Sequence, residues 1–353
     1  MTRVGIVGLG LIGGSLALRL VESGCEVCAW NHTPHPYAAA RDAGIRCMGS
    51  LEELARSGPR VIVLCNPLRA MPEVLAALAP VLDHDATTLT DVGSVKGMVR
   101  RQVAEAGLSS CYVGAHPMAG NERSGFAAAD ARLFDHALWA VTVDSATGFP
   151  RFLSVVRLVL EQVGDRIIVI DDALHDRSAA MISHMPHVVA TAMINELTAA
   201  PERCVAAAMS AGSWRDMTRV ALTDPQRTRA MVVEDSRNVA RLLHEMSRRL
   251  EDAAGMLERG DASDIDAFFA AGQPYRDYRS ALSRPADRRG FGLDGEAVGS
   301  GEWRRILKDS ALRGERIVGI DPTGYDSTGD NVTGEGSAAA GTGWRVRVER
   351  RDF

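Results

Sequence analysis

The 353-residue chain lacks the features that would assign it to a membrane or to a nucleic acid. No apolar run approaches the roughly 18 residues that cross a bilayer, and the N-terminus has no basic segment followed by a cleavable apolar stretch. Lys and Arg total 40 against 45 Asp and Glu, which gives a net charge of −5 without any long basic run. These absences favour a cytoplasmic protein whose partner is a small molecule.

Cysteine is also sparse, with six residues spread along the chain. This number suits buried reduced thiols better than a disulfide framework. Cys25 and Cys28 form a CxxC pair, but they lie in CEVCAW, which has the composition of a strand. Residues three apart in a strand face opposite sides, so we expect neither a redox motif nor a zinc site there.

Short β-branched runs alternate with helical patterns over residues 1–171. The expected strands cover residues 3–9, 26–31, 61–66, 87–92, 111–116, 139–144 and 165–171. This alternation predicts a mostly parallel sheet flanked by helices. Residues 172–284 carry long helical patterns with few strand signals, which predicts an all-α domain that provides subunit contacts.

The composition changes again over residues 285–353. The stretch 290–343 contains 13 glycines together with many Ser, Thr and Asp residues, and a charged segment, WRVRVERRDF, follows it. Such a composition buries too little apolar surface to offset the entropy of ordering. We therefore expect a flexible C-terminal tail.

A glycine motif joins the first expected strand to the first helix. Gly8, Gly10 and Gly13 form G-x-G-x-x-G, in which the first glycine allows a tight turn and the second lets the backbone approach a pyrophosphate. The third lets the helix pack closely on the strand. The phosphate would lie on the helix N-terminal amides, beside Leu11 and Ile12. The motif predicts a Rossmann-like dinucleotide-binding domain.

The choice between NAD and NADP depends on the end of the second expected strand. Asn31, His32 and Thr33 stand where an NAD-preferring site usually offers Asp or Glu to the adenosine ribose. A carboxylate would repel a 2′-phosphate, whereas these side chains can donate hydrogen bonds to it. Asn31 can also serve the ribose of NAD, so both cofactors stay open and NADP is slightly favoured.

Two polar segments follow neighbouring strands toward the carboxyl edge of the sheet, where doubly wound folds bind ligands. Ser94 lies in DVGSVK, where it could take part in chemistry or cap the following helix. His116 begins HPMAGNERSG, which we expect to form a loop, and it suits a base that takes a hydroxyl proton as hydride leaves. Glu122 could tune this histidine or be an exposed loop carboxylate.

The helical domain offers two further polar groups. His184 and His187 in SHMPH share a helix face, but two ligands without a local acid make a metal site unfavourable. We expect no metal and a substrate-facing or interfacial pair. Asp216 and Arg219 lie in GSWRDMTR, where an arginine could bind a carboxylate or belong to a surface ion-pair cluster.

Taken together, GLGLIGGS, DVGSVK, HPMAGNERSG, SHMPH and GSWRDMTRVALTDP, in this order and spacing over roughly residues 1–280, resemble the prephenate/arogenate dehydrogenase family of tyrosine biosynthesis. The resemblance implies a Rossmann domain at residues 1–171 and a helical domain at 172–284 that forms a homodimer. It also implies NAD(P)-dependent oxidative decarboxylation of a cyclohexadienol acid. The tail at 285–353 does not resemble the regulatory domain that some members append.

The resemblance also implies roles at matching motif positions. His116 would be the general base that accepts a hydrogen bond from the ring hydroxyl, and Ser94 would assist it. Glu122 would stand at the entrance of the site.

The same carry-over applies to the helical domain. Arg219 would bind a substrate carboxylate, with Asp216 as its ion-pair partner. His184 and His187 would line the cleft from the helical domain.

Three alternatives remain. Arogenate differs from prephenate only by an amino group in place of the keto oxygen, and an acidic side chain aimed at that amine would favour it. A β-hydroxyacid dehydrogenase commonly relies on a lysine in its helical domain, and residues 172–283 contain none. A non-catalytic nucleotide-sensing protein would have no reason to keep Ser94, His116 and Arg219 together.

Overall fold

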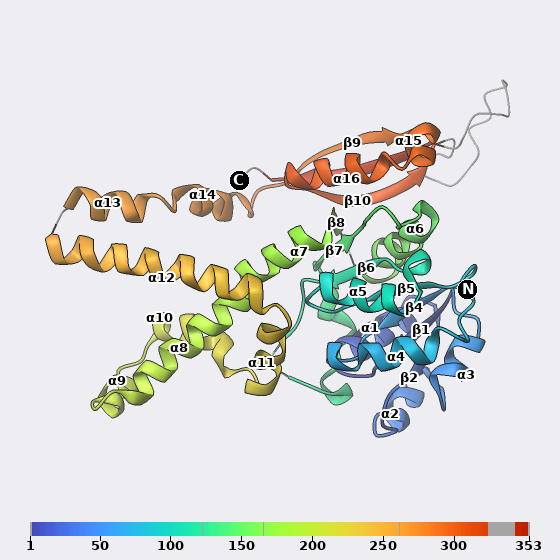
Figure 1. The fold of residues 1–353 in the computed structure, drawn as a ribbon, viewed down its shortest axis with the longest axis horizontal. Coiled ribbons are helices and arrows are strands. Elements are labelled where there is room, and N and C mark those ends of the chain that lie inside the picture. The colour runs from blue at the N-terminus through green and yellow to red at the C-terminus, as the bar shows by residue number, and fades with distance from the viewer. Residues whose placement is uncertain (1, 122, 165, 261, 324–342, 352–353) are drawn as a thin grey trace. The chain divides into compact units, whose positions relative to one another are not determined.

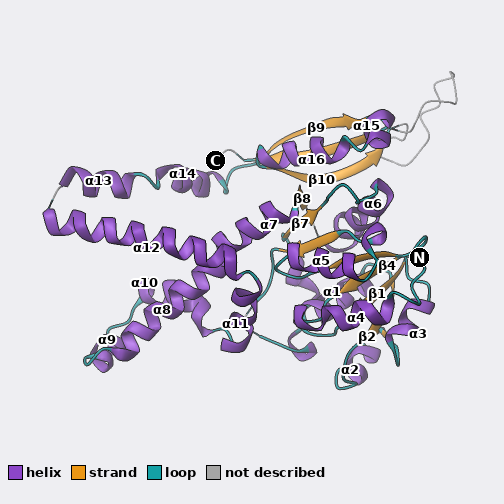
Figure 2. Cartoon of the chain, in the orientation of Figure 1, coloured by secondary structure: helices purple, strands orange, loops and turns teal. Residues whose placement is uncertain are grey.

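The computed structural model describes residues 2–121, 123–164, 166–260, 262–323 and 343–351 (Figure 1). The chain divides into two compact units. The α/β unit comprises Met1–Gly120, Ser124–Asp172 and Tyr275–Phe353, and the helical unit comprises Asn121–Arg123 and Ala173–Pro274. Strands occur in the first unit, whereas the described part of the second is built from helices (Figure 2).

The first sheet of the α/β unit has five parallel strands in the order β3-β2-β1-β4-β5. Their bounds are Arg3–Val7 (β1), Glu26–Trp30 (β2), Arg46–Cys47 (β3), Val61–Leu64 (β4) and Thr88–Asp91 (β5). The strands are apolar because both faces are covered. Val4 and Ile6 of β1 join one buried cluster, while Val7 joins the other.

Helices connect these strands and cover the two faces of the sheet. Their bounds are Leu11–Glu22 (α1), Tyr37–Asp42 (α2), Leu51–Arg56 (α3), Met71–Leu78 (α4) and Gly97–Glu105 (α5). Leu16 of α1 belongs to one buried cluster, whereas Leu54 of α3 and Leu75 of α4 belong to the other. The predicted Rossmann-like arrangement is confirmed.

A second sheet of six strands has the order β6-β7-β8-β10-β11-β9. Its strands are Gly114–Pro117 (β6), Leu138–Thr142 (β7), Arg166–Ile170 (β8), Asp287–Leu293 (β9), Glu315–Pro322 (β10) and Trp344–Arg350 (β11). A parallel bridge between Leu89 and Tyr112 links β5 to the start of this sheet. All seven expected strands are present, but only the first sheet is wholly parallel, because β7 runs antiparallel to β6.

The expected flexible tail is wrong for the described residues beyond 285. These residues form β9, β10 and β11 with two helices, Gly295–Ser300 (α15) and Trp303–Leu312 (α16). In β11, Val346 and Val348 alternate with charged residues and are fully buried, which is a strand pattern. Gly319 makes room for the Arg347 side chain, because an added Cβ would lie 2.2 Å from its guanidinium. Residues 324–342 lie outside the described part of the chain.

Aromatic side chains join this C-terminal segment to the rest of the α/β unit. Trp303 of α16 is buried, with its ring centroid 4.7 Å from that of Phe152 and 5.2 Å from that of Phe149 in α6 (Phe149–Arg157). Trp344 of β11 lies 5.5 Å from Phe149. The high glycine content of the segment gave no sign of this aromatic cluster. Its contacts bury the apolar surface that orders the segment.

The helical unit confirms the all-α prediction. Its helices are Asp172–Ala179 (α7), Met185–Ala199 (α8), Arg203–Ala208 (α9), Gly212–Thr218 (α10), Pro225–Glu234 (α11), Ser236–Arg259 (α12) and Ala262–Ala270 (α13). The next helix, Gln273–Ala281 (α14), leads back into the α/β unit. A buried cluster in the helical unit consists of Ala180, Val239 and Leu242.

Shorter helical turns complete the described structure. The 3-10 segments are Leu68–Ala70, Ser109–Cys111, Phe126–Ala128, Ala131–Phe134 and Arg219–Leu222, and the π-helical segments are Leu158–Val163 and Ala180–His184. No helix in the described ranges is long and apolar enough to cross a membrane.

Candidate active site

The three motif glycines of the loop between β1 and α1 are required for different reasons. Gly8 has φ +101°, and an added Cβ would lie 2.9 Å from the carbonyl oxygen of Cys65. A Cβ at Gly13 would lie 1.9 Å from the carbonyl oxygen of Gly8. A Cβ at Gly10 would meet no atom within 4 Å, so this glycine leaves open space. The loop therefore has the shape that lets a pyrophosphate approach the backbone at Gly10.

Helix α1 begins directly after this open position. Gly10 is the N-cap residue and no side chain caps the helix. The first intrahelical bond runs from the Gly14 N–H to the Gly10 carbonyl at 2.8 Å, so the N–H groups of Leu11, Ile12 and Gly13 precede it. These amides and the helix dipole together suit an anion. The residues present thus fit a dinucleotide.

Asn31 braces the glycine loop from the end of β2. Its Oδ1 accepts a hydrogen bond from the Leu9 N–H at 2.8 Å, and its Nδ2 donates to the Thr33 carbonyl at 2.9 Å. The side chains of His32 and Thr33 are exposed. Asn31 therefore keeps one amide hydrogen for a ligand, and the two following residues can supply further donors.

The expected strand position of the CxxC pair is confirmed for Cys28, which lies in β2, whereas Cys25 stands one residue before this strand. Cys25 joins the buried cluster on one face of the sheet and Cys28 joins the cluster on the other, and both are free thiols. Burial raises the pKa of both thiols above the ordinary cysteine value. The pair therefore contributes packing, which leaves redox chemistry without support.

The segment DVGSVK links β5 to α5 through a buried ion pair. Asp91 and Lys96 are both fully buried and bonded to each other, and Asp91 also accepts from the Gly93 N–H at 2.8 Å. Helix α5 begins at Gly97 with Lys96, and not Ser94, at the N-cap position, and the Lys96 side chain makes no capping hydrogen bond. The interpretation of Ser94 as the helix cap is therefore wrong, and its partly buried side chain stands in the connecting loop.

His116 lies in β6, one residue before the end of the strand, which agrees with the expected strand at residues 111–116 but not with a loop that begins at this histidine. It stands opposite Ala140 of β7 and is partly buried. Because β6 starts parallel to β5, its carboxyl end points to the same edge as the ends of β1, β4 and β5. The preceding Ala115 carbonyl accepts a hydrogen bond from Lys96 Nζ at 2.8 Å.

The segment after His116 is fastened to α1 at its far end. An added Cβ at Gly14 would lie 2.8 Å from the ring of Phe126, and the Asp130 N–H donates to Ser15 Oγ at 3.0 Å. The connection from β6 to β7 therefore packs against the helix that follows the glycine loop. Glu122, for which a role at the site entrance was expected, lies outside the described residues.

In the helical unit, His184 and His187 belong to a distorted part of the helix. A π-helical segment, Ala180–His184, precedes α8, whose second residue is Pro186. Proline lacks the N–H that continues an α-helical ladder, and π-turns accommodate such interruptions and recur at functional sites. The expected simple helix face is therefore modified by a local irregularity.

His184 is held by an acid that the sequence did not suggest. Its Nδ1 lies 3.0 Å from Asp235 Oδ2, and Asn238 donates to the other Asp235 oxygen at 2.8 Å. His184 is fully buried, and within the described residues its Nε2 has no hydrogen-bond partner. His187 Nδ1 lies 2.9 Å from the Ser183 carbonyl oxygen. Both imidazoles are thus oriented through Nδ1.

Arg219 and Asp216 are both exposed, and no ion pair joins them among the described residues. The expected ion pair is therefore wrong for this structure. Asp216 lies in the last turn of α10, whereas Arg219 begins the following 3-10 turn. An exposed pair at this spacing gains little from association in water, so solvation of both groups competes well.

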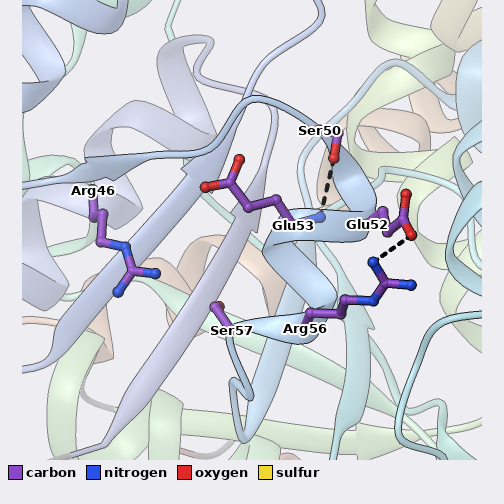
Figure 3. A pocket seen from close by; sticks show the side chains of 6 residues that line it. All are labelled: Arg46, Ser50, Glu52, Glu53, Arg56 and Ser57. Atoms are coloured by element: carbon purple, nitrogen blue, oxygen red, sulfur yellow. Dashed lines mark hydrogen bonds and ion pairs between the residues drawn. The ribbon is translucent and has the colours of Figure 1, made fainter.

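Two surface pockets of about 340 Å³ each are lined by residues other than these. The first is drawn in Figure 3 and is lined by Arg46, Ser50, Glu52, Glu53, Arg56 and Ser57. Ser50 Oγ accepts from the Glu53 N–H, and Arg56 pairs with Glu52 at 2.6 Å, so these groups serve α3 itself. The second pocket lies among α8, α9 and α10 and includes Trp214.

Metal chemistry has no cluster to support it within the described ranges. No group of three or more His, Cys, Asp or Glu side chains gathers there in a way that could hold a metal ion. His184 and Asp235 are oriented toward each other, and Asn238 completes their hydrogen bonds. The chemistry that these residues offer is acid–base chemistry and anion binding.

Comparison with known proteins decides the family. Residues 16–169 match the nucleotide-binding domain of prephenate dehydrogenase, and residues 171–271 match its dimerisation domain. The cyclohexadienyl dehydrogenase of Zymomonas mobilis is 32% identical over 241 residues, which is 66% of this chain and 81% of the relative. The chain belongs to the prephenate dehydrogenase family.

Solved structures of the prephenate dehydrogenase family agree with this fold. Prephenate dehydrogenase from A. aeolicus, in complex with hydroxyphenyl propionate and NAD⁺, has a TM-score of 0.72 and 29% identity, covering 78% of this chain and 97% of that one. Synechocystis arogenate dehydrogenase has a TM-score of 0.69 and 26% identity, covering 79% and 100%. The family domains end at residue 271, so β9, β10 and β11 lie beyond them.

Sequence reasoning missed two residues of the α/β unit, Lys96 and Tyr112, and one residue of the helical unit, Asp235. Asp235 contacts a histidine 51 positions away, which no local motif could indicate. Lys96 and Tyr112 both bond Asp91, and Lys96 was visible in DVGSVK without an assigned role. The sequence did offer a signal for the contact between Lys96 and Asp91, because the lysine stands five residues after an aspartate that ends a strand.

Proposed function

We propose that this chain is a prephenate dehydrogenase, which converts prephenate to 4-hydroxyphenylpyruvate by NAD(P)-dependent oxidative decarboxylation. The observation that carries the proposal is the shared edge of the α/β unit. The glycine loop follows β1, Ser94 follows β5, and His116 lies near the end of β6. The carboxyl ends of these three strands point the same way. Family membership supplies the substrate class.

The chemistry needs a base, an orienting donor and a carboxylate contact. When bound, the nicotinamide supplies the hydride acceptor. His116 would take the proton of the ring hydroxyl, and Ser94 would hydrogen-bond the same hydroxyl. Loss of the ring carboxylate as carbon dioxide then forms an aromatic ring, which provides the driving force. The protein mainly orients the groups and removes one proton.

The helical unit would bind the rest of the substrate. Arg219 would hold a carboxylate, with Asp216 close to it in sequence. His184 and His187 would face the substrate with Nε2, because Nδ1 of each ring already contacts another group. These assignments are supported by the exposure of Arg219 and by the Nε2 of His184, which has no hydrogen-bond partner in the described part of the chain. Glu122 would stand at the entrance.

The direct test crosses prephenate and arogenate with NAD and NADP and follows formation of reduced cofactor by absorbance. Turnover of prephenate supports the proposal. Exclusive turnover of arogenate would assign the chain to the alternative activity, in line with its likeness to the Synechocystis enzyme. Cofactor binding without turnover of either acid would indicate a nucleotide-sensing protein.

Replacing Arg219 by alanine should mainly raise KM for the substrate, by about tenfold or more, because a charge-assisted contact to a carboxylate is lost. Steady-state kinetics measures the change. Arg215 is a matched control, since it is an exposed arginine of the same segment, and its alanine variant should retain the normal KM. An unchanged KM in Arg219→Ala would place this side chain outside the site.

We also propose that NADP is used at least as well as NAD. Asn31 holds the glycine loop without the negative charge of an acid, and His32 and Thr33 are exposed beside it. Asn31→Asp should lower kcat/KM for NADP by about tenfold or more, because a carboxylate repels the 2′-phosphate. It should leave kcat/KM for NAD nearly unchanged, since the carboxylate can still accept from Leu9. A strong NAD preference in the unaltered protein would contradict the proposal.

The enzyme would act as a cytoplasmic homodimer assembled through the helical unit. This unit matches the family's dimerisation domain. It also exposes large apolar side chains, whose burial between two subunits would be favourable. They include Met181, Ile182, Leu250 and Leu257.

A further inference from the structure

A fully buried lysine contacts the backbone next to the candidate base of the α/β unit. Lys96 and Asp91 have no exposed surface, and Lys96 Nζ donates to Asp91 Oδ2. The same ammonium donates to the Ala115 carbonyl oxygen at 2.8 Å. This carbonyl belongs to the peptide group whose N–H is that of His116. The lysine therefore contacts the backbone that sets the direction of the His116 side chain.

Tyr112 connects Asp91 to the same strand region. Its hydroxyl donates to Asp91 Oδ1 at 2.7 Å, and its side chain is 1% exposed. Burial, together with the neighbouring Asp91 carboxylate, raises the pKa of Tyr112 well above its ordinary value. The phenol thus stays protonated and remains a donor. Asp91 also accepts a hydrogen bond from the Gly93 N–H, at 2.8 Å.

We propose that Lys96, Asp91 and Tyr112, here called the buried network, are positioning residues that fix Ser94 and His116 relative to each other. The loop that carries Ser94 is held on both sides. Asp91 accepts from the Gly93 N–H before Ser94, and Lys96 stands at the start of α5 after it. Lys96 contacts the strand that carries His116, and Tyr112 ties the segment just before this strand to Asp91. The chemical importance of the two held residues rests on the proposed function.

The shape of β6 is fitted to the buried network. A Cβ added to Gly114 would lie 3.0 Å from the Tyr112 hydroxyl, 3.3 Å from Lys96 Cδ and 2.4 Å from Thr142 Oγ1. Any larger residue two positions before His116 would therefore push against the two donors. The glycine leaves the space that the lysine and the phenol occupy.

Stability alone gives little reason for such a network. A buried ion pair is often no more stabilising than apolar residues of similar volume, because two charges must lose their water. Lys96 is also the N-cap residue of α5, where the helix dipole disfavours a positive charge. Aromatic or aliphatic packing could hold β5 and β6 together equally well. What the charges add is directed hydrogen bonding to chosen backbone and side-chain atoms.

The test separates the energy of the fold from the placement of His116. Lys96→Met should lower both Tm and kcat, because it leaves the Asp91 charge buried without its partner. The double variant Asp91→Asn with Lys96→Met removes both charges and should recover much of the lost Tm. It should keep kcat about 10- to 100-fold below that of the unaltered protein, since a misplacement of about 1 Å at a reacting group costs this much.

A matched control breaks an ion pair elsewhere in the same unit. Arg166 Nη1 lies 2.9 Å from Glu349 Oε1, and both side chains are mostly buried. Arg166→Met should lower Tm without changing kcat. Tyr112→Phe removes one hydroxyl and should lower kcat by a smaller factor than Lys96→Met. A double variant with recovered Tm and normal kcat would overturn the proposal, because the network would then serve the fold alone.

A second readout does not need turnover. Diethyl pyrocarbonate modifies accessible imidazoles, and mass spectrometry of the full-length protein's peptides measures the rate at His116. The Lys96→Met and double variants should change this rate several-fold, while Arg166→Met should not. Equal rates in all variants would contradict positioning. If the unaltered protein turns over neither substrate, the proposed function is refuted. The comparison of modification rates at His116 then still tests whether the buried network positions this residue.

Discussion

Replacing His116 by asparagine should lower kcat by about a hundredfold or more while leaving the substrate KM largely intact. Asparagine keeps a polar side chain of similar reach, but its amide cannot take a proton near neutral pH. His116 is partly buried in β6 opposite Ala140, so the smaller side chain fits the strand without new backbone contacts. Steady-state kinetics on prephenate measures the change.

A second histidine of the α/β unit provides the control. His136 is exposed and has φ 63°, a backbone conformation that asparagine tolerates better than most residues. His136→Asn should therefore retain both Tm and kcat. Near-normal turnover in His116→Asn would end its assignment as the base, whereas a large rise in KM with normal kcat would make it a binding residue.

The pH dependence of kcat gives an independent check on the same residue. A general base must be unprotonated to act, so kcat of the unaltered enzyme should fall as the pH is lowered. In His116→Asn the residual rate should lose this acidic limb. An acidic limb of the same shape in the variant would assign the titration to another group.

Local motifs could predict much of the α/β unit because each describes a short piece of chain. The motif glycines encode a turn, an open position and a close approach, and the geometry at Gly8, Gly10 and Gly13 agrees with all three. Strand runs such as VIVL are apolar since both faces of a parallel sheet are covered. These features depend on neighbours in sequence, which a reader of the sequence can see.

Contacts between distant segments could not be predicted in the same way. Asp235 orients His184 across 51 positions, and Lys96 reaches Ala115 only because β6 lies beside β5. The C-terminal segment failed for a related reason. Its glycines suggested disorder, but Val346, Val348 and Trp303 are buried against the rest of the α/β unit. Composition alone does not show which residues are buried, because burial depends on which distant segments of the chain pack together.

Replacing Gly13 by alanine should remove cofactor binding and destabilise the α/β unit. The added methyl would lie 1.9 Å from the Gly8 carbonyl oxygen and 2.8 Å from Cys65 Cβ, so α1 must move away from β1. A clash with backbone cannot be relieved by rotating a side chain, and we expect a loss of about 2–4 kcal/mol in the free energy of unfolding. Denaturant unfolding and calorimetric titration of NADP and NAD measure the two effects.

Gly10→Ala is the matched variant, since its methyl would meet no protein atom within 4 Å. Its free energy of unfolding should stay within about 1 kcal/mol of the normal value, because only the N-cap preference of α1 changes. Its cofactor Kd should still rise by about tenfold or more, as the methyl occupies the space where a pyrophosphate approaches the backbone. Normal cofactor binding in Gly10→Ala would contradict a pyrophosphate at this loop. Normal stability in Gly13→Ala would show that α1 can shift without cost, and the close approach of helix and strand would then not explain the glycine.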